Sequence, residues 1–382
     1  MQYRSPQSPD LLIAGASARA AAFSAVRAGL MVAAADLFAD RDLAVVADVT
    51  VIERWPDDIE RWAERFPPAI PLMYVGGLEN HPELLSRLAQ KRPLAGIVSE
   101  PLHIVRTPEI LHQLLTTHGV PVARLASEML TVERRWLVKP RKSGGGRGIR
   151  ILAGTRESVT PDEYVQEIIE GTAGSAAFLA TDAGSVELIG TCDGLDSTNS
   201  VLRDNLSFGY FGSITNDGGE SAALERVGRV LTSIGLRGLF GVDFVRTHDE
   251  RCVVVEVNPR YTASMELFEL QTGRSFVAEQ LAAFDLVPRG QAASIGRTET
   301  GKPVFGKRIV YAPQDLRVGR PVPDIADILG GDYHVADIPD RDALVPALFP
   351  ICTVFARAAT RDECRAELIR REAEILKRCE PT

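Results

Sequence analysis

The sequence predicts an α/β protein that opens with a Rossmann-like parallel sheet and closes with a small β-rich unit. At the N-terminus, a short apolar run, a helical segment and a second apolar run follow one another as in a βαβ unit. In the second half, the apolar runs 239–245 and 252–257 flank a polar turn, which predicts a β-hairpin. The chain of 382 residues is long enough for two or three packed units.

Composition narrows the class of protein. Apolar residues make up 45% and charged residues 25% of the chain, as is usual for a soluble globular protein. The net charge of −8 argues against a general nucleic-acid binder, and no apolar run is long enough to span a bilayer. The five cysteines include no CxxC pair, so we expect no zinc site and a reducing, cytoplasmic location.

The N-terminal βαβ unit consists of strand 11–14, a helix over 18–28 and strand 30–35, which ends at Asp36. A dinucleotide site is an alternative for such an opening. The run GASARA after the first strand, however, lacks the second and third glycines of GxGxxG, so close approach to a pyrophosphate is not supported.

A second strand end carries polar residues. The apolar run 70–75 is followed by GGLEN, which places Glu79 and Asn80 in the loop after the strand. Ligands of parallel sheets meet the loops at the carboxyl ends of strands, so Glu79 and Asn80 are candidate substrate contacts. The alternative is a plain turn before the helix that Pro82 opens.

A lysine and a glycine-rich loop follow each other in the middle of the chain. Lys139 ends the apolar run 136–138 and can reach a phosphate as a mobile charge. The segment SGGGRGI then places Gly144, Gly145 and Gly146 where backbone N–H groups can close over phosphate oxygens. It is not a Walker loop, and alone it would favour a flexible hairpin turn. The lysine-bearing strand before it and another apolar run after it favour a phosphate site.

The hairpin carries a candidate metal site. Glu256 and Asn258 are two residues apart and therefore lie on one face of the second strand, and Asp243 lies in the middle of the first. Three oxygen-bearing side chains on one face suit Mg²⁺, which shares its shell with substrate phosphates. Arg260 follows and could stabilise a phosphate or a developing anion. An ordinary hairpin with a hydrogen-bonded aspartate is the alternative.

Asp243 followed by the run Glu256-Val-Asn-Pro-Arg260 resembles the metal-binding end of the ATP-grasp superfamily. Within it, the chain is most similar to the predicted ATP-dependent carboligases related to biotin carboxylase, over roughly residues 10–365. The resemblance implies an ATP-grasp fold in three domains. They are an N-terminal pre-ATP-grasp domain (1–107), an ATP-grasp domain (108–287, with a lid at about 131–180) and a small β-rich C-terminal domain (288–382).

The resemblance also implies residue roles. Lys139 and the three glycines would bind the phosphates of ATP, with help from Lys142 and Arg147. The strand YVQEIIEG would hold adenine, which points to Gln166, Glu167 and Ile169, whereas an edge strand with solvated glutamates is the alternative. Arg19 becomes a candidate clamp for a substrate carboxylate, or else a solvated helix charge.

By the same resemblance the chain is an ATP- and Mg²⁺-dependent ligase, with Mn²⁺ as an alternative ion. It would join a small carboxylic acid to an amine through an acyl phosphate, with Lys139 and Arg260 as catalytic residues. Alternatives are a bicarbonate-using carboxylase or an inactive nucleotide-binding regulatory protein. The segment 192–212 lacks the basic QRRxQK-type run of biotin carboxylase, which argues against biotin as substrate. A homodimer is compatible with the resemblance.

Four further expectations concern single residues. Glu266 or Glu269, on a helix expected over 265–276, would support the metal residues from behind. Lys307 and Arg308 could face the cleft, but we expect surface charges. The run 208–214 would be a strand near the substrate. Cys352 would be a core residue, since no base partner is identifiable.

Overall fold

The computed structural model describes residues 8–126, 135–153, 158–182, 185–216, 218, 221–286, 303–319 and 334–382. The predicted boundary at 287/288 and the predicted start of the lid at 131 lie outside these residues. Within the described part of the chain, no helix is both long and apolar enough to cross a membrane.

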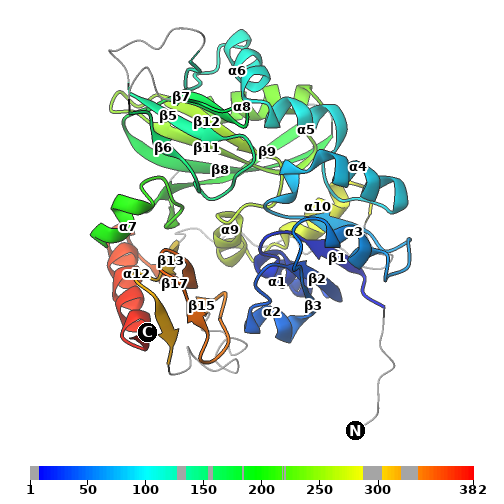
Figure 1. Ribbon diagram of the computed structural model, residues 1–382. Helices are drawn as coiled ribbons and strands as arrows, with labels where there is room; N and C mark the ends of the chain where they lie inside the picture. Colours follow the sequence, from blue (N-terminus) through cyan, green and yellow to red (C-terminus); the bar gives the residue numbers. More distant parts are fainter. Residues whose placement is uncertain are drawn as a thin grey trace.

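The N-terminal part is the predicted parallel sheet, which lies at the lower right in Figure 1. Its strands are ordered β3-β2-β1-β4 and comprise β1 (Leu11–Ala14), β2 (Val32–Asp36), β3 (Ala47–Val51) and β4 (Leu72–Tyr74). The connecting elements are α1 (Arg19–Arg27), α2 (Arg41–Val46), α3 (Asp58–Ala63), the 3-10 helix η1 (Leu78–Asn80) and α4 (Pro82–Lys91). Strands β1 and β2 are buried along their whole length, as expected for parallel strands covered on both faces.

Asp36 has a structural task at the end of β2. One carboxylate oxygen accepts a hydrogen bond from the Ala18 N–H (3.2 Å) at the start of α1, and the other accepts from Phe38 and Ala39. These backbone donors occupy the carboxylate that a dinucleotide site would offer to a ribose.

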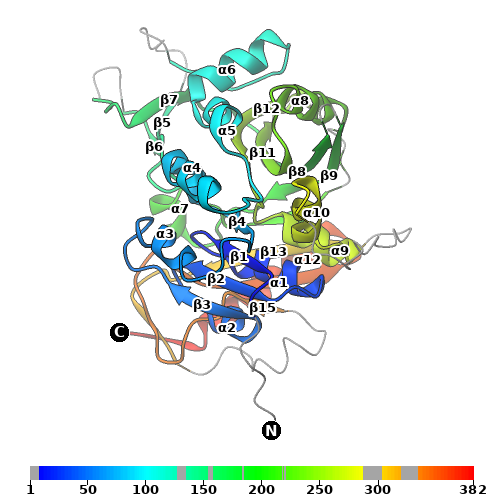
Figure 2. The ribbon, with the colours of Figure 1, turned by 90° about the vertical axis from the view of Figure 1, so that its right-hand side faces the viewer.

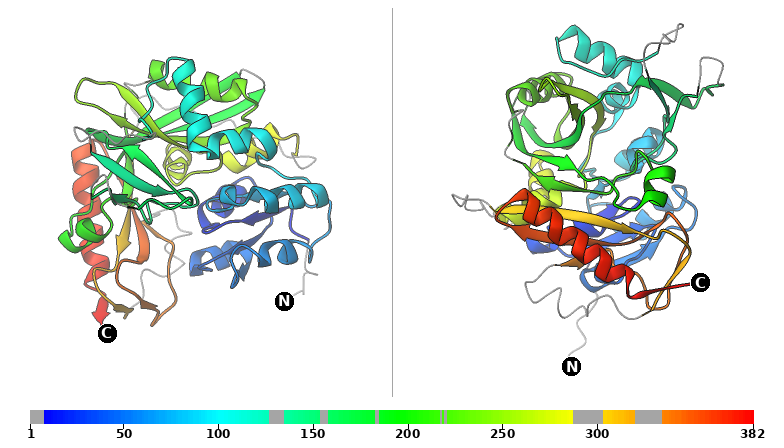
Figure 3. Two further views of the ribbon diagram at one scale, coloured as in Figure 1. Left: turned by 45° about the horizontal axis from the view of Figure 1, so that its top comes forward. Right: turned by 90° about the vertical axis from the view of Figure 1, so that its left-hand side faces the viewer.

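The centre of the molecule is an antiparallel sheet of eight strands in the order β12-β11-β8-β9-β10-β13-β17-β15. The strands are β8 (Thr172–Asp182), β9 (Ser185–Gly194), β10 (Gly212–Thr215), β11 (Gly238–Arg246), β12 (Cys252–Asn258), β13 (Val304–Tyr311), β15 (Val335–Ala336) and β17 (Pro350–Ala358). The strands β11 and β12 are the predicted hairpin. The sheet curves around α8 (Ser221–Ser233), while α9 (Met265–Thr272) and α10 (Phe276–Ala283) cover the opposite face (Figure 3).

A small sheet in the order β6-β5-β7 carries the lysine and the glycine-rich loop. It consists of β5 (Trp136–Pro140), β6 (Arg150–Ile151) and β7 (Glu163–Glu167). The predicted lid, which reached about residue 180, is too long, because β8 pairs with β11 from Thr172 onward and so belongs to the central sheet. Two further helices, α5 (Ser99–Arg106) and α6 (Pro108–Thr117), lie beside this sheet in Figure 2.

The C-terminal part is β-rich as predicted, but three of its strands extend the central sheet. Strand β13 pairs with β10, and β17 and β15 follow. Its other elements are β14 (Leu316–Val318), β16 (Leu344–Val345), α12 (Arg361–Leu376) and β18 (Cys379–Pro381). Earlier in the chain, a short helix α7 (Ser200–Asn205) lies between β9 and β10. The predicted strand 208–214 is shorter, because its first part turns toward the glycine-rich loop, where the Tyr210 N–H donates to the Gly145 carbonyl (3.3 Å). Cys352 is buried in the core, as expected.

The N-terminal part and the central sheet share one hydrophobic core. Tyr74 of β4, Val105 of α5 and Val257 of β12 belong to the same buried cluster. The Tyr74 hydroxyl also donates to the Pro259 carbonyl (3.1 Å), which fixes the chain just before Arg260 against β4.

Candidate active site

Three predicted metal residues come together on the β11–β12 hairpin. Asp243 and Glu256 are direct cross-strand partners, and a β-bulge follows Asp243. Asn258 lies two residues after Glu256 on the same face, and its Nδ2 donates to Asp243 Oδ2 at 2.9 Å. The hairpin thus brings two carboxylates and one amide into a single cluster.

The electrostatics of this cluster favour a cation. Burial, together with the facing Glu256 carboxylate, raises the pKa of Asp243 to about 7. Burial would also raise the pKa of Glu256, but Lys139 and Arg106 outweigh burial and lower it. Two carboxylates held face to face in a buried site are costly unless a positive charge lies between them.

The oxygen donors of this cluster fit Mg²⁺, which prefers carboxylate and carbonyl oxygens. Asp243 and Glu256 would hold the ion. The Asn258 amide oxygen accepts from Arg260 Nη2 (3.2 Å), so it has to turn toward Asp243 to become a ligand. Among the described residues, no group of three or more His, Cys, Asp or Glu side chains is arranged to hold a metal, which agrees with a set containing only two carboxylates.

A pocket opens next to Glu256 between β12, the β5–β7 sheet and helices α5 and α6. Its polar lining includes the predicted residues Lys139, Gly144, Gly146 and Gln166, together with Arg106, Ser143 and Glu256. Its apolar lining includes Val105, Leu111, Val122, Leu125, Ile149 and Val257. A polar end beside an apolar wall is what a nucleotide requires.

Lys139 lies at the polar end of this pocket. Its Nζ donates to Gln166 Oε1 (3.2 Å), and Gln166 in turn donates to the Val255 carbonyl (3.2 Å). Burial opposes the charged form of Lys139, but the nearby Glu256 raises the pKa above its ordinary value, so the ammonium stays charged.

Three of the predicted nucleotide contacts do not line the pocket. Gly145, Glu167 and Ile169 are not among its lining residues. The Glu167 N–H donates to the Arg124 carbonyl (2.9 Å), and its side chain lies 4.0 Å from the Arg124 guanidinium.

The glycine-rich loop is held by close backbone contacts. Gly145 and Gly146 have positive φ values of 62° and 77°. A Cβ on Gly146 would lie 1.7 Å from the Phe208 carbonyl oxygen, so only glycine fits there. Asn80 Nδ2 lies 3.4 Å from the Ser143 carbonyl, which ties the loop to the N-terminal sheet.

Arg106, at the end of α5, is a site residue that the sequence did not indicate. Its Nη1 donates to Glu256 Oε1 (3.1 Å) and its Nη2 to Asn80 Oδ1 (2.6 Å). A cation in the last turn of a helix is common, so the sequence offers no signal that this one faces the metal cluster.

Arg260 lies beside the cluster but is held by Glu79. Its Nε donates to Glu79 Oε1 at 2.6 Å, and burial of this pair is nearly complete. Burial opposes the charged form of Arg260, but Glu79 raises its pKa. The other Glu79 oxygen is buried without a hydrogen-bond partner in the described part of the chain. The structure therefore places Glu79 as the anchor of Arg260 and Asn80 as a partner of Arg106.

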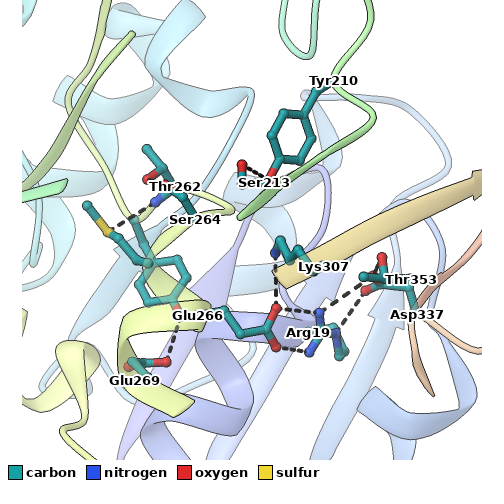
Figure 4. Close-up of polar contacts among 12 residues, drawn as sticks. Arg19, Tyr210, Ser213, Thr262, Ser264, Glu266, Glu269, Lys307, Asp337 and Thr353 are labelled. Atoms are coloured by element: carbon teal, nitrogen blue, oxygen red, sulfur yellow. Dashed lines mark hydrogen bonds and ion pairs between the residues drawn. The ribbon is translucent and has the colours of Figure 1, made fainter. Parts of the chain in front are cut away.

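The predicted clamp Arg19 lies in a separate buried charge cluster, shown in Figure 4. Its side chain is 2% exposed and pairs with Glu266 through both Nη groups, one of them at 3.0 Å from Oε2. It also pairs with Asp337 (2.8 Å) and lies 3.8 Å from Asp42. A substrate carboxylate would therefore have to compete with three carboxylates that already lie next to Arg19.

Four expectations for neighbouring residues are wrong. Glu266 and Glu269 do not support the metal residues. Glu266 pairs with Arg19 and Lys307 (Figure 4), and Glu269 binds Ser24, Arg27 and the Tyr261 hydroxyl. Lys307 and Arg308 are not surface charges but are 4% and 2% exposed. They point to opposite faces of β13, toward Glu266 and Glu372 respectively.

Known proteins resemble this chain in its central domain and in its fold. Residues 110–264 match the family model of the ATP-grasp domain. No curated protein sequence matches the chain. Solved structures of similar fold include a biotin carboxylase–β-γ-ATP complex from Campylobacter jejuni (TM-score 0.70, 15% identity, 94% of this chain and 90% of that chain).

Two other solved structures cover nearly all of this chain. One is the biotin carboxylase domain dimer of Hydrogenobacter thermophilus 2-oxoglutarate carboxylase with MgADP, ADP and bicarbonate (TM-score 0.68, 14% identity, 98% and 91% covered). The other is an L-amino acid ligase from Bacillus licheniformis (TM-score 0.65, 15% identity, 98% of both chains). Residues 110–264 thus match the ATP-grasp domain, and the chain as a whole has the ATP-grasp fold.

Proposed function

We propose that the protein is an ATP- and Mg²⁺-dependent ligase that joins a carboxylic acid to an amine. One observation carries the proposal. Two partly buried carboxylates, Asp243 and Glu256, face each other, and Glu256 lines a pocket that also contains Lys139 and part of the glycine-rich loop. A cation between the carboxylates and a polyphosphate beside the lysine would satisfy the charges of both groups.

The proposed reaction has two steps. A carboxylate oxygen of the acid attacks the γ-phosphorus of ATP, the bond to the β–γ bridging oxygen breaks, and ADP and an acyl phosphate form. The amine nitrogen then attacks the acyl carbon and loses a proton as phosphate leaves, which completes the amide.

The chain contributes positioning and charge to these steps, as phosphoryl transfer requires. Lys139 and the backbone of the glycine-rich loop would bind the phosphates, and Asp243, Glu256 and Asn258 would hold the metal ion. Mg²⁺, when bound, would neutralise phosphate charge. Arg260, fixed by Glu79, stabilises charge on the transferring group.

The test is an ADP-release screen of the full chain across carboxylic acids paired with amines, with and without Mg²⁺. ADP release that requires both an acid and an amine supports the ligase. Bicarbonate-stimulated ADP release without an amine would instead indicate a carboxylase, a reaction type also found among proteins of this fold. ATP binding without ADP release under any mixture would indicate a regulatory nucleotide-binding protein.

Glu256→Ala is expected to abolish ADP release while the protein stays folded, because one of two metal carboxylates is lost. Circular dichroism would check the fold and a coupled assay would measure ADP. A folded variant with wild-type turnover would show that the metal assignment is wrong.

A further inference from the structure

A row of polar side chains continues from the metal cluster across one face of the central sheet. Lys307 on β13 is the direct cross-strand partner of Ser213 on β10, and the register carries the same face through β9 and β8 to Asp243 on β11. Cross-strand partners share a face. The polar row comprises Asn258, Glu256, Asp243, Ser175, Cys192, Ser213 and Lys307.

Hydroxyl groups gather along this row between Asp243 and Lys307. The Tyr210 hydroxyl lies 2.9 Å from Ser213 Oγ (Figure 4). Burial raises the pKa of Tyr210, so its hydroxyl stays protonated and can donate a hydrogen bond. Ser175 Oγ is buried without a hydrogen-bond partner among the described residues. The row therefore contains a polar atom that protein groups leave unsatisfied.

The segment after Arg260 covers this row. Thr262 packs directly on Gly241, where a Cβ would lie 2.6 Å from its methyl carbon. The hydroxyls of Thr262 and Ser264 lie 3.4 Å apart, and Glu266 follows at the start of α9. A short stretch of chain thus connects the phosphoryl end of the site, at Arg260, to the partner of Lys307.

Lys307 is one end of a chain of alternating charges. Lys307 Nζ donates to Glu266 Oε2 (3.1 Å), and Glu266 pairs with Arg19, which in turn pairs with Asp337. An ammonium has three N–H donors; among the described residues, the Lys307 ammonium donates to Glu266 and lies 5.9 Å from the centre of the Phe355 ring. A negatively charged group beside the Lys307 ammonium, on the side of the polar row, would continue the alternation of charges.

We propose that Lys307 binds the carboxylate of a small polar acid, such as an amino or hydroxy acid, whose polar groups meet the hydroxyls of Tyr210 and Ser213. The inference rests on the proposed function in one respect, because the acid bound by Lys307 is taken to be the acid that ATP activates. Three parts of the molecule enclose the site: Arg19 comes from the N-terminal part, Glu266 from α9 and Lys307 from β13 (Figure 4).

A purely structural role for Lys307 makes a different prediction. Glu266 already receives hydrogen bonds from both Nη groups of Arg19, so it keeps a charge partner when Lys307 is removed. Lys307→Met preserves the length of the side chain and removes only the ammonium. It should therefore fold, and its ligand binding reports on the ammonium.

The experiment is isothermal calorimetry of the full chain with excess MgADP. L-glutamate, L-aspartate, glycine and L-malate are titrated into the wild type, Lys307→Met, Lys307→Arg and Lys91→Met. Lys91 is the matched control, since its ammonium also pairs with carboxylates, Glu60 and Glu64, but on the surface of α4. Circular dichroism checks that each variant is folded.

The expected result is that at least one acid binds the wild type and that Lys307→Met weakens its affinity by about 10- to 100-fold, the effect of losing one charge-assisted hydrogen bond. Lys307→Arg should keep part of the affinity, and Lys91→Met should bind as the wild type does. Equal binding by folded Lys307→Met, or no binding of any of the four acids to the wild type, would overturn the proposal.

The two proposals fail in different ways. Acid binding that depends on Lys307, combined with no ADP release in the acid and amine screen, would refute the ligase and leave the carboxylate site standing. ADP release with the same KM for the acid in Lys307→Met and the wild type would refute the site and leave the ligase standing.

Discussion

Replacing Asp243 with asparagine is expected to stabilise the protein in the absence of divalent cations and to remove its response to Mg²⁺. Asp243 faces Glu256 across the hairpin in a buried site, and its pKa is raised to about 7 by burial and by that neighbour. Asparagine has nearly the same shape and can still accept a hydrogen bond from Asn258. The substitution therefore removes the charge and little else.

The magnitude follows from the pKa. The folded value of about 7 exceeds the ordinary value of 3.8, so between these pH values the unfolded chain loses the proton while the folded chain keeps it. Wild-type stability therefore falls as pH rises through this window and then levels off. At about 1.4 kcal/mol per pKa unit, roughly 4 kcal/mol is the upper limit of the gain for Asp243→Asn above pH 7. Below about pH 4 the gain should vanish.

Urea denaturation at about pH 4 and pH 8, with EDTA or with excess MgCl₂, measures both effects. In EDTA at the higher pH the variant should be more stable than the wild type. Mg²⁺ should stabilise the wild type, by about 2.7 kcal/mol at a hundredfold excess over its Kd, and leave the variant unchanged.

The matched control is Asp249→Asn in the turn of the same hairpin. There, hydrogen bonds from Thr247 and Arg251 lower the pKa of an exposed carboxylate, so no gain is expected at the higher pH. A variant Asp243→Asn that is less stable than the wild type in EDTA, or that responds to Mg²⁺ as the wild type does, would refute the reasoning.

Two other substitutions probe the loop and the arginine. Gly146→Ala should weaken ATP binding by about tenfold or more, because Gly146 has a positive φ and the Phe208 carbonyl leaves no room for a Cβ. Calorimetry with ATP would measure the affinity. The control is Gly119→Ala, whose Cβ would meet nothing within 4 Å. Glu79→Gln should lower kcat more than it raises the KM for ATP, because Arg260 loses its charged anchor. Steady-state kinetics that show only a change in KM would contradict this role.

Local sequence patterns determined the hairpin and the order of the phosphate-binding parts. The two-residue period of a strand fixes Glu256 and Asn258 on one face, and the lengths of the two apolar runs leave little choice of register. The same applies to Lys139, which lies near the end of β5, shortly before the glycine-rich loop. The β-rich C-terminal part was also predicted, although three of its strands (β13, β15 and β17) join the central sheet.

The partners of distant charges could not be predicted in this way. Arg106 contacts Glu256 and Asn80, and Lys307 contacts Glu266, over long sequence separations. Nothing in the local sequence distinguishes such a residue from a solvated helix or strand charge. Such a charged side chain is removed from water only when the domains pack against each other. Its partner is then the opposite charge that this packing brings close to it.

The sequence by itself determined the cluster of Asp243, Glu256 and Asn258 and the order of the lysine and the glycine-rich loop, because each depends on neighbours along one strand or one hairpin. The ATP-grasp fold was predicted from the resemblance of these motifs to that superfamily. Only the tertiary structure decided that Glu79 anchors Arg260, that Arg19 is occupied by carboxylates, and that Lys307 is buried near the same sheet face. These contacts depend on how the eight-stranded sheet, the parallel sheet and a helix pack against one another. The periodicity of residues along a single strand or helix does not determine that packing.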